Sequence, residues 1–516
     1  MSSTVSDLPN RRMILIVIAM VSCLVMLDNN VVAVALPTIA ASLNADFSDL
    51  QWVITGYVLP FAALLIAAGS FSDKVGRRLS AVIGMIIFGL ASLSCGLAVS
   101  PLMLNLSRAV QGVGASLLLT ASMAIINHTF QGTERAKAYA FWGACMGAAI
   151  TCGPIVGGVI SSAFGWIWAF LINVPICTVL VVATLKIIPE SRDPDAKRLD
   201  YLGILTLSSA LFLLIWAVID GNTVGWFTLE ILWRVFAGLV LLLVFGIVEK
   251  QQSNPMVNFD IVRAPNFAGA AFAMVGYAAG AQVMIFYLPL YLQNAFSFAP
   301  VIAGVSMLPF ALPMFLVPRL GAKLAVTPRA ILSAGLCITA MGNIAMALLA
   351  DTEAPYYAFA LAMITAGTGA GILNGETAKA VQGAVPPNQS GVGSGIASTV
   401  RFTSLLFSVA ALGAVLVSFM LIRFLPMAES FGMSSASAAL IAKRFSAGDT
   451  TALLATLPVA SGESVLAALR TAFQSGFGAA AWVASAVAIA ALVLTRWLMI
   501  ETRLKTSAES AFVAGE

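Results

Sequence analysis

One acidic residue lies in the middle of an apolar stretch near the start of the chain. Asp28 is the only charged residue in the segment 13–36. A carboxyl group inside a membrane span is costly unless it is paired or faces water. An apolar environment favours the neutral form of that group, which suits a residue that takes up and releases protons. Asp28 is therefore either a proton-transferring group or a partner in a structural hydrogen bond between helices.

A second apolar stretch, 101–126, contains a basic residue within the sequence LNLSRAVQGVGASLL. Arg108 needs a counter-charge inside a membrane, and Asp28 is the natural candidate. Gln111 lies one helical turn further on and is a candidate for the lining of a substrate cavity. Gly112 and Gly114 would let a neighbouring helix approach closely. The alternative reading of Arg108 is a purely structural salt bridge.

A short charged segment, GSFSDKVGRR, joins two further apolar stretches. It carries one acid and three bases within ten residues, and its glycines permit a tight turn between two helix ends. A carboxylate here could cap a helix N-terminus or pair with an arginine, and such a contact would break if the helices slid. The alternative is a solvated loop that only sets topology. The candidate latch residues are Gly69, Asp73, Gly76, Arg77 and Arg78.

Glycines recur at helical spacing in the apolar segment 138–163, which contains GAAITCGPIVGGVI. Gly153 and Gly157 form a small-xxx-small pair that favours close helix packing, and Pro154 is expected to kink the helix. Gly147 and Gly158 belong to the same pattern. Simple packing is the alternative reading, and it is compatible with a functional role.

Other polar and aromatic residues in the second half could line a cavity. An aromatic stripe is more often packing or an interface belt, so both readings stay open for it. Glu376 is either a second titratable group or a surface acid, and Arg401 is a second cation within an apolar segment. The stripe consists of Gln282, Phe286, Tyr287 and Tyr291.

Several chemistries are disfavoured by the sequence. No Gly-Lys pair occurs, so a phosphate-binding loop of the Walker type is excluded. His128 is the single histidine, and the six cysteines show no metal-ligand spacing. No catalytic dyad is recognisable. We therefore expect no enzymatic activity, no metal, no cofactor, and no nucleotide or nucleic-acid partner.

The elements that must position these residues are long apolar segments. The chain has 516 residues, of which 60% are hydrophobic and 10% charged. A soluble domain needs more polar surface, so we expect an all-α polytopic membrane protein. We predict about fourteen spans, at residues 13–36, 51–71, 79–99, 101–126, 138–163, 167–188, 201–219, 230–248, 267–292, 300–320, 329–350, 355–380, 395–422 and 477–500.

The placement of lysine and arginine supports this set of spans. Basic residues lie in the connections after spans 2, 4, 6, 8 and 10 and, as Lys379, at the end of span 12, whereas the connections after spans 1, 3, 5, 7, 9 and 11 carry none. Basic residues mark cytoplasmic loops. We therefore predict that both termini, 1–12 and 501–516, are cytoplasmic and that the protein spans the inner membrane.

The order of the spans predicts two related halves. Gly69 and Arg77 have counterparts in Gly321 and Arg329, and such weak repeats are typical of transporters built from two six-helix bundles. The predicted domains are an N-terminal bundle at 13–188, two additional central helices at 201–248, and a C-terminal bundle at 267–500. Within the last, we expect the loop 423–476 to form an amphipathic helical hairpin, with segments 434–445 and 463–473, on the outer surface.

Several of these motifs resemble those of the major facilitator superfamily. GSFSDKVGRR resembles the family's loop between helices 2 and 3, which implies a cytoplasmic latch between the two halves. VMLDNNVVAVALP and R-x-x-Q-G-x-G-A resemble span-1 and span-4 motifs of the fourteen-helix drug:H⁺ antiporters, and the resemblance ties Arg108 to proton transfer. GAAITCGPIVGGVI resembles the antiporter motif of export-type members. Arg401 resembles the arginine of an N-x-x-R-Q motif, although Ser398 and Phe402 stand beside it here.

The resemblance implies a major facilitator fold with two extra central helices, and a monomeric proton-coupled antiporter. The expected activity is export of hydrophobic drugs or toxic compounds, cationic ones first, across the cytoplasmic membrane by alternating access. Asp28, Arg108 and Glu376 would couple protons to transport. The alternative is an exporter of a metabolite or an anionic amphiphile, for which Arg108 and Arg401 would bind charge. A non-transporting receptor or scaffold is the remaining alternative.

Overall fold

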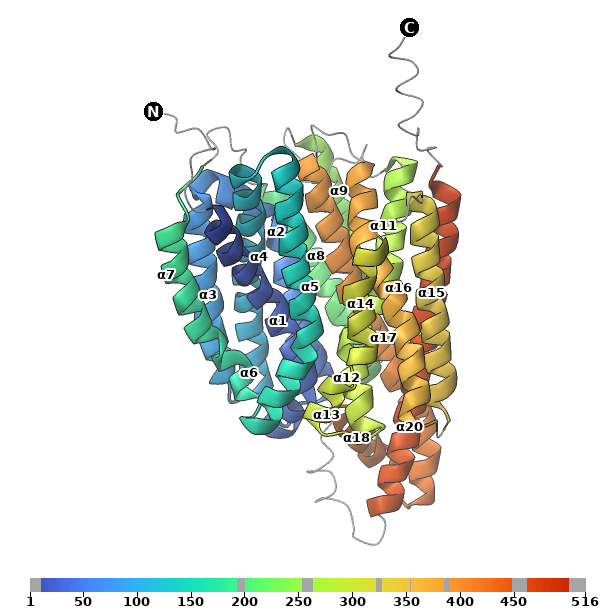
Figure 1. Cartoon of the computed structure of the whole chain (residues 1–516). Helices are drawn as coiled ribbons and strands as arrows, with labels where there is room; N and C mark the ends of the chain where they lie inside the picture. Colours follow the sequence, from blue (N-terminus) through green and yellow to red (C-terminus); the bar gives the residue numbers. More distant parts are fainter. Residues whose placement is uncertain are drawn as a thin grey trace, which may run out of the picture.

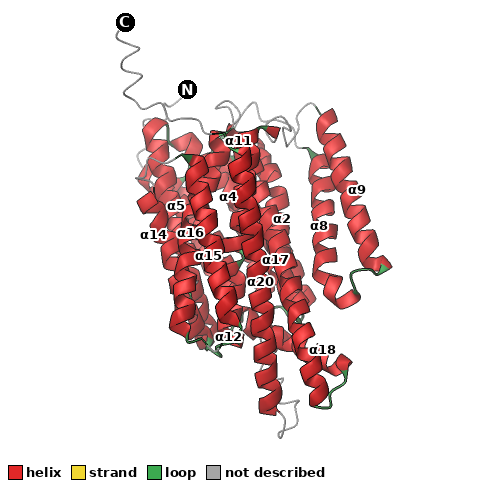
Figure 2. Cartoon of the chain, turned by 90° about the vertical axis from the view of Figure 1, so that its right-hand side faces the viewer, coloured by secondary structure: helices red, strands yellow, loops and turns green. Residues whose placement is uncertain are grey.

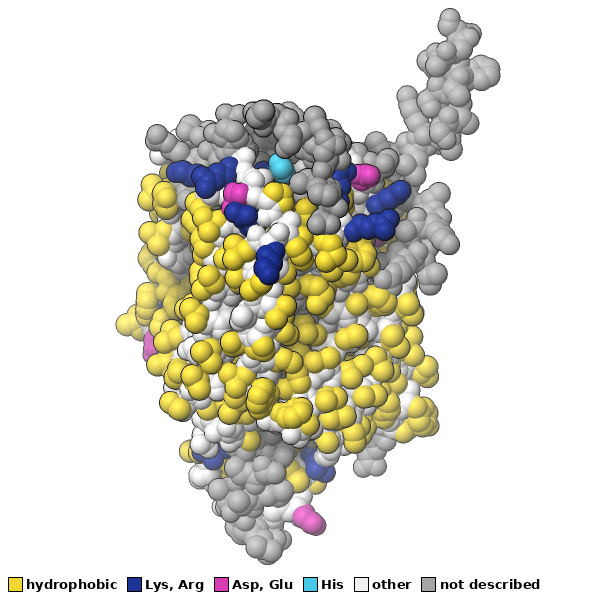
Figure 3. Space-filling model, turned by 60° about the vertical axis from the view of Figure 1, so that its left-hand side comes forward, with side chains coloured by type: hydrophobic (Ala, Val, Ile, Leu, Met, Phe, Trp, Pro, Cys, Tyr) yellow, Lys and Arg dark blue, Asp and Glu magenta, His cyan; other side chains and the backbone are white. Residues whose placement is uncertain are grey.

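The computed structural model describes residues 11–192, 200–252, 263–321, 327–352, 354–384, 390–447 and 462–500. Within these ranges the chain is helical, and fourteen segments are long and apolar enough to cross a membrane. The prediction of an all-helical polytopic membrane protein is therefore confirmed. Figure 3 shows apolar side chains covering most of one flank, with basic side chains gathered toward its upper end.

The first helices of the chain form one group, on the left in Figure 1. In this group α2 packs on α4, α3 packs on α4, and α1 packs on α5. We call these helices the first half. They are α1 (Arg11–Leu43), α2 (Phe47–Val75), α3 (Arg77–Gly96), α4 (Pro101–Thr129), α5 (Gly132–Ala163), α6 (Ile167–Leu171) and α7 (Asn173–Ile187).

The last helices form a second group on the right in Figure 1, which we call the second half. Here α15 packs on α16 and α20, and α17 packs on α20. The helices are α11 (Pro265–Tyr277), η2 (Ala278–Gln282), α12 (Met284–Asn294), α13 (Pro300–Val305), α14 (Leu308–Gly321), α15 (Pro328–Ala350), α16 (Tyr356–Gly383), α17 (Ser390–Ser430), α18 (Ser435–Ser446) and α20 (Gly462–Leu498).

The two halves meet along α1, α2 and α5 of the first half. α5 contacts α13 and α14, α2 contacts α17, and α1 contacts α12. α1 begins and α20 ends at the upper end of the molecule in Figure 1, which we call the terminal end. The other end, where α2 and α4 begin, is the opposite end.

Two helices between the halves in sequence form a separate pair. α8 (Tyr201–Val224) packs on α9 (Leu229–Gln251) and also contacts α17 and α2. In Figure 2 this pair stands at the side of the bundle, with α9 outermost. Arg234 of α9 is buried against the ring of Trp216, and it forms ion pairs with Asp220 and Glu230.

Five spans differ from the sequence-based expectation. The sixth and the tenth are each divided into two helices, α6 with α7 and α13 with α14. The ninth contains a turn of π-helix, η2, between α11 and α12. α17 and α20 have 41 and 37 residues, and at about 1.5 Å per residue each exceeds the ~30 Å hydrocarbon core. The expected hairpin is therefore wrong in part: 435–446 is the amphipathic helix α18, but 463–473 is the continuous start of α20. Residues 448–461 lie outside the described residues.

Candidate functional site

The two intramembrane charges singled out in the first half form an ion pair. Arg108 Nη1 of α4 lies 2.7 Å from Asp28 Oδ2 of α1, and neither side chain is exposed. Asp28 lies near the middle of α1, and Arg108 lies in the second turn of α4. The structure thus brings together the pair that the sequence suggested, inside the first half.

Three neutral side chains complete the surroundings of Asp28. Gln111 Nε2 donates to Asp28 Oδ1 at 3.0 Å, and Asn173 Nδ2 donates to the same oxygen at 2.7 Å. The Ser92 hydroxyl accepts from both amides and donates to the carbonyl of Phe170. Asn173 and Ser92 were missed by the sequence analysis, because uncharged residues of these types are common in helices.

Arg108 is held by the first half on its other sides. Its Nε donates to the carbonyl of Val53 at 3.0 Å, and its guanidinium lies 4.1 Å from the ring centre of Tyr57. A Cβ atom at Gly112 would lie 2.2 Å from the Tyr57 carbonyl, so glycine allows α4 to approach α2 here. The Nη2 atom is buried without a hydrogen-bond partner among the described residues. The ion pair is therefore held by residues of four helices, α1, α2, α4 and α7.

This arrangement is specific for an ionised carboxylate. Both oxygens of Asp28 accept hydrogen bonds from N–H donors, one of them from a guanidinium. A proton on Oδ2 would occupy the direction in which Arg108 Nη1 now donates. Protonation of Asp28 and its ion pair with Arg108 therefore exclude one another. A buried cation left without its partner is unfavourable, so a proton at Asp28 would require the surrounding helices to rearrange.

The candidate latch residues lie at the terminal end, where α2 turns into α3. Asp73 pairs with Arg77 one turn away, at 3.0 Å. Gly76 has φ +128°, a conformation that favours glycine. The carboxylate of Glu190 accepts from the backbone N–H of Arg78 at 3.0 Å and so caps the start of α3.

Two further observations complete the description of this turn. A Cβ atom at Gly76 would lie 2.7 Å from Glu190 Oε1, whereas a Cβ atom added at Gly69 would have no atom within 4 Å. The contacts named for this turn are therefore made within the first half, to the segment that follows α7. A contact to the second half, as the latch hypothesis implies, stays a prediction.

The glycine motif of α5 lies between two neighbouring helices. A Cβ atom at Gly153 would lie 2.4 Å from Asn30 Cβ, and one at Gly157 would lie 2.7 Å from the Val31 carbonyl, both on α1. On the side toward the second half, a Cβ atom at Gly158 would lie 2.5 Å from the carbonyl of Pro300.

Two other motif positions lie at the same contact with the second half. The Pro154 carbonyl lies 2.3 Å from the position of a Cβ on Gly304, and Phe315 lies 3.2 Å from that of Gly147. The motif residues therefore let α5 pack closely on α1 and on the second half at once.

Two of the aromatic candidates lie between the halves, near the opposite end. Phe286 and Tyr287 of α12 line a small pocket with residues of α1, α2 and α17. The Tyr287 hydroxyl donates to the carbonyl of Val409, and its ring stacks with Phe47. Gln51 Nε2 also donates to the Val409 carbonyl, at 3.0 Å.

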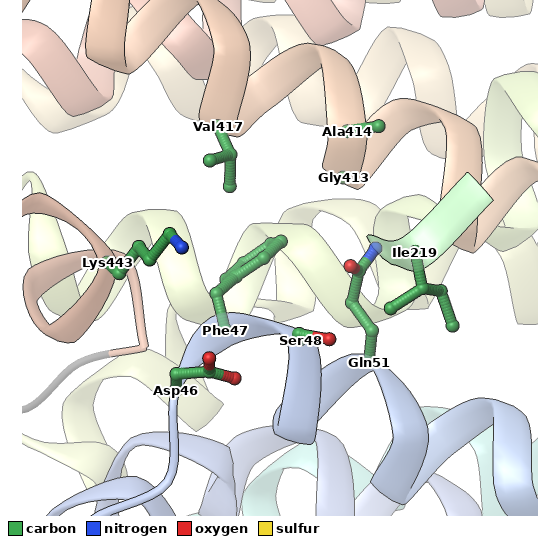
Figure 4. Close-up of a pocket in the computed structure, with 9 residues that line it drawn as sticks. All are labelled: Asp46, Phe47, Ser48, Gln51, Ile219, Gly413, Ala414, Val417 and Lys443. Atoms are coloured by element: carbon green, nitrogen blue, oxygen red, sulfur yellow. The ribbon is translucent and has the colours of Figure 1, made fainter. Parts of the chain in front are cut away.

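A second pocket, of about 300 Å³ including its mouth, adjoins the first (Figure 4). Gln51 and Phe47 of α2 extend toward α17 in this view, and Lys443 of α18 approaches from one side. The first pocket lies where α1, α2, α12 and α17 meet, and the second lies where α2, α8, α17 and α18 meet. The contacts around them hold the two halves together at the opposite end.

The other predicted site residues lie apart from this region and from Asp28. Tyr291 is buried inside the second half, with its ring centre 4.2 Å from that of Phe477, so it packs the core. Glu376 pairs with Lys379 of the same helix at 2.6 Å. Gln282 is the last residue of η2, and its Oε1 has no hydrogen-bond partner among the described residues. Arg401 donates to Asn374 within the second half.

Comparison with known proteins places the chain in a family. The sequence model of the Major Facilitator Superfamily matches residues 18–408. The chain is 33% identical over 400 residues to the methylenomycin A resistance protein of Streptomyces coelicolor, covering 76% of this chain and 83% of that protein. It is 28% identical over 482 residues to the multidrug efflux pump LfrA of Mycolicibacterium smegmatis, covering 92% and 94%.

A third relative and a solved structure are also similar to this chain. The riboflavin transporter RibZ of Clostridioides difficile is 29% identical over 395 residues, covering 75% of this chain and 84% of that protein. A bacterial homolog of the human lysosomal transporter Spinster, solved in an inward-facing and unoccupied conformation, has the same fold. Its TM-score is 0.61 at 16% identity, with 96% of this chain and 98% of that chain covered. With its fourteen apolar helices, this chain belongs to the major facilitator superfamily and is a multi-pass membrane transporter.

Proposed function

We propose that this transporter exports hydrophobic compounds, drugs among them, in exchange for protons. The observation that carries the proposal is the buried ion pair of Asp28 and Arg108, in which a proton and an arginine compete for one carboxylate oxygen. The names of two relatives, a multidrug efflux pump and an antibiotic resistance protein, support export of toxic compounds. The span-5 motif and the other antiporter motifs support exchange in the outward direction.

The proposed cycle uses the two halves as rocking bodies. In this cycle the terminal end, where α1 begins and α20 ends, faces the cytoplasm of the cell, in keeping with its basic loops. A proton that reaches Asp28 from outside releases Arg108, and the loss of the ion pair shifts the first half toward another packing. Substrate binding from the inside favours release of the proton from Asp28 into the cytoplasm, after which the ion pair forms again. The energy comes from the proton gradient, and no cofactor takes part.

The test is flux across reconstituted membranes with an imposed pH gradient. Asp28→Asn keeps the size of the side chain but removes its titration, so substrate flux should no longer respond to the pH gradient. Asp220→Asn is the matched control, because Asp220 is also paired with an arginine but lies in the α8–α9 pair, outside the two halves. It should leave the response to the pH gradient intact.

The outcomes separate clearly. Loss of gradient-driven flux in Asp28→Asn, with normal insertion and with a functional Asp220→Asn protein, supports the proposal. Gradient-driven flux at the wild-type level in Asp28→Asn would remove Asp28 from the coupling mechanism. The same measurement on Glu376→Gln decides the role of the second acid, for which its exposed pairing with Lys379 favours no contribution.

A second candidate is the export of an endogenous metabolite. The observation that favours it is the similarity to a protein named as a riboflavin transporter. A panel of toxic cations and of antibiotics, applied to cells with and without the gene, separates the two. Increased resistance to several unrelated compounds supports drug export, whereas resistance to none of them favours a dedicated metabolite exporter.

A further inference from the structure

A cation in the second half lacks the acidic partner that its counterpart in the first half has. Arg401 of α17 is half-buried, and its Nη2 donates to Asn374 Oδ1 of α16 at 3.0 Å. The hydroxyl of the fully buried Tyr277 donates to the same oxygen at 3.0 Å. The Nε atom of Arg401 is buried and has no hydrogen-bond partner among the described residues. Arg401 Nη2 also makes a long hydrogen bond of 3.5 Å to the Tyr277 hydroxyl. These two neutral acceptors therefore satisfy part of a charged guanidinium and leave the Nε donor without a partner among the described residues.

Arg401 differs from three other arginines of the described chain in having no acidic partner. Arg108, Arg77 and Arg234 each form an ion pair with a carboxylate. Arg401 forms none with any described residue, and residues 385–399, which adjoin it in sequence, contain no acid. A half-buried arginine without a carboxylate is unfavourable, and it is retained more readily where a negative group arrives from outside the chain.

Arg401 lies close to the contact between the two halves. The next residue, Phe402, lies edge-on to Phe61 of α2, with ring centres 4.6 Å apart. This part of α17 therefore faces the first half. Tyr277 directly precedes the π-helical turn η2, and such turns occur frequently at functional sites. The three polar groups thus come from three helices of the second half, at its boundary with the first.

We propose that Arg401, positioned by Asn374 and Tyr277, binds an anionic group of the transported compound. The proposal rests on the proposed export function and names its substrate class: hydrophobic compounds that carry a carboxylate or another oxyanion. A carboxylate would accept from Nε, whose hydrogen is now unused, and from an adjacent Nη group in the two-point geometry that arginine favours. The hydrophobic body of the substrate would contact the apolar side chains between the halves.

The charges inside the two halves favour the same class of substrate. Asp28 and Arg108 neutralise each other, so the described side chains of the two sites contribute a net charge of one positive unit, from Arg401. A permanently cationic compound would meet repulsion from that charge, and an anionic one would meet attraction. The proposal thus differs from the expectation from sequence that cationic drugs come first, and the two-probe experiment below decides between them.

The experiment compares two probes that share an aromatic body and carry opposite charges. 1-Pyrenebutyrate and 1-pyrenebutyl-trimethylammonium both attach their charged group to pyrene through a short alkyl chain, and their fluorescence reports binding to the full-length protein in lipid nanodiscs. No gradient is applied, so the result is independent of proton coupling. The variants are Arg401→Gln, Arg401→Lys and Asn374→Asp, the last of which supplies the missing carboxylate at nearly unchanged size.

Arg401→Gln and Asn374→Asp should each weaken binding of the anionic probe about ten- to a hundredfold, the usual range for a charge-assisted hydrogen bond. Both should leave the cationic probe unchanged or bound more tightly. Arg401→Lys keeps the charge but not the two-point geometry, so its affinity for the anion should lie between those of the wild type and Arg401→Gln. Equal weakening of both probes by Arg401→Gln would make the arginine a structural residue and overturn the proposal. Wild-type protein that prefers the cationic probe would overturn it too. Gradient-driven flux at the wild-type level in Asp28→Asn, which would remove Asp28 from the coupling mechanism, would by contrast leave these binding results standing.

Discussion

Asn173 shows how a neutral residue can control a charged one. It is the first residue of α7, directly after the break at Ile172, and its amide reaches both Asp28 and Ser92. Because it donates to the ionised carboxylate, it stabilises the state in which Asp28 is paired with Arg108. A side chain of similar size without the amide would remove this preference and keep the packing.

We predict that Asn173→Leu weakens the coupling of transport to protons. The variant removes the N–H donor to Asp28 Oδ1 at nearly unchanged size, so the ion pair of Asp28 with Arg108 loses one of its supporting hydrogen bonds. A hydrogen bond to a charged group is worth ~1.5–3 kcal/mol. Substrate flux under an imposed pH gradient, compared with that of the wild type, measures the loss. Gradient-driven flux at the wild-type level would show that the Asn173 amide does not support the paired state.

At the scale of residues, the sequence identifies the charged members of the site more readily than the neutral residues that contact them. The pairing of Asp28 with Arg108 could be predicted from the sequence, because an isolated charge in an apolar segment is unfavourable. Ser92, Asn173 and Glu190 could not be selected, because their partners depend on the rotation of α3 and α7 and on the path of the chain after α7. Tyr291 carried the same signal as Tyr287, yet only Tyr287 lies between the halves.

At the scale of elements, α5 is the helix that both halves use. Its glycines meet backbone atoms of α1 on one side and of α13 on the other. Backbone atoms cannot move aside as the tip of a flexible side chain can. A methyl group added at these positions must therefore push two helices apart.

Gly157→Ala should therefore destabilise the protein by ~1–3 kcal/mol, the usual cost of overpacking, and should reduce export. Gly143→Ala in the same helix is the matched control, because no atom lies within 4 Å of its added Cβ. Thermal unfolding in detergent and substrate flux in vesicles measure the two effects. Equal behaviour of the two variants would show that α5 and α1 are not closely packed at Gly157.

The lengths of the elements were less predictable than their number. The sequence marks where apolar character ends, but α17 and α20 continue as helices beyond that point because polar and small residues are compatible with a helix outside the bilayer. The π-helical turn in the ninth span also has no clear signal in AAGAQ. Its hydrogen bonds shift by one residue in response to packing between α11, α17 and α20, which a single sequence does not display.

At the scale of the whole molecule, the halves are held together at the opposite end by Gln51, Tyr287 and the Val409 carbonyl. Gly413 lies against this group: an added Cβ would lie 2.0 Å from Gln51 Nε2 and 2.5 Å from the Tyr287 hydroxyl. The contact must open whenever the opposite end opens in an alternating-access cycle. Gly413 thus sets how tightly this end can close.

We expect Gly413→Ala to favour the arrangement that is open at the opposite end by about tenfold, through overpacking of the closed one. The rate at which a membrane-impermeant maleimide labels Ser48→Cys, a residue of the adjoining pocket, reports this opening. Gly375→Ala is the control, since no atom lies within 4 Å of that added Cβ. An unchanged labelling rate in Gly413→Ala would mean that the contact does not limit opening.

The substrate charge has a consequence for the energetics of the whole cycle. Exchange of one proton for one cation is electrically neutral, whereas exchange of one inward proton for one outward anion moves two positive charges inward. A membrane potential contributes about 2.3 kcal/mol per charge per 100 mV. We predict that a negative-inside potential alone, set by valinomycin and potassium at equal pH, drives export of 1-pyrenebutyrate. Flux that responds to the pH gradient but not to the potential would contradict an exchange of this stoichiometry.

The ion pairs of the α8–α9 pair have a consequence for membrane insertion during synthesis of the chain. Arg234 is an arginine in a span that the insertion machinery must release into lipid, which is costly for an isolated cation. Its partners Asp220 and Glu230 precede it by 14 and 4 residues, so both have left the ribosome before Arg234 does. The hairpin can therefore neutralise its own cation during synthesis, before the later helices exist. A ribosome-bound chain that ends soon after α9 already carries both acids that pair with Arg234 in the folded protein.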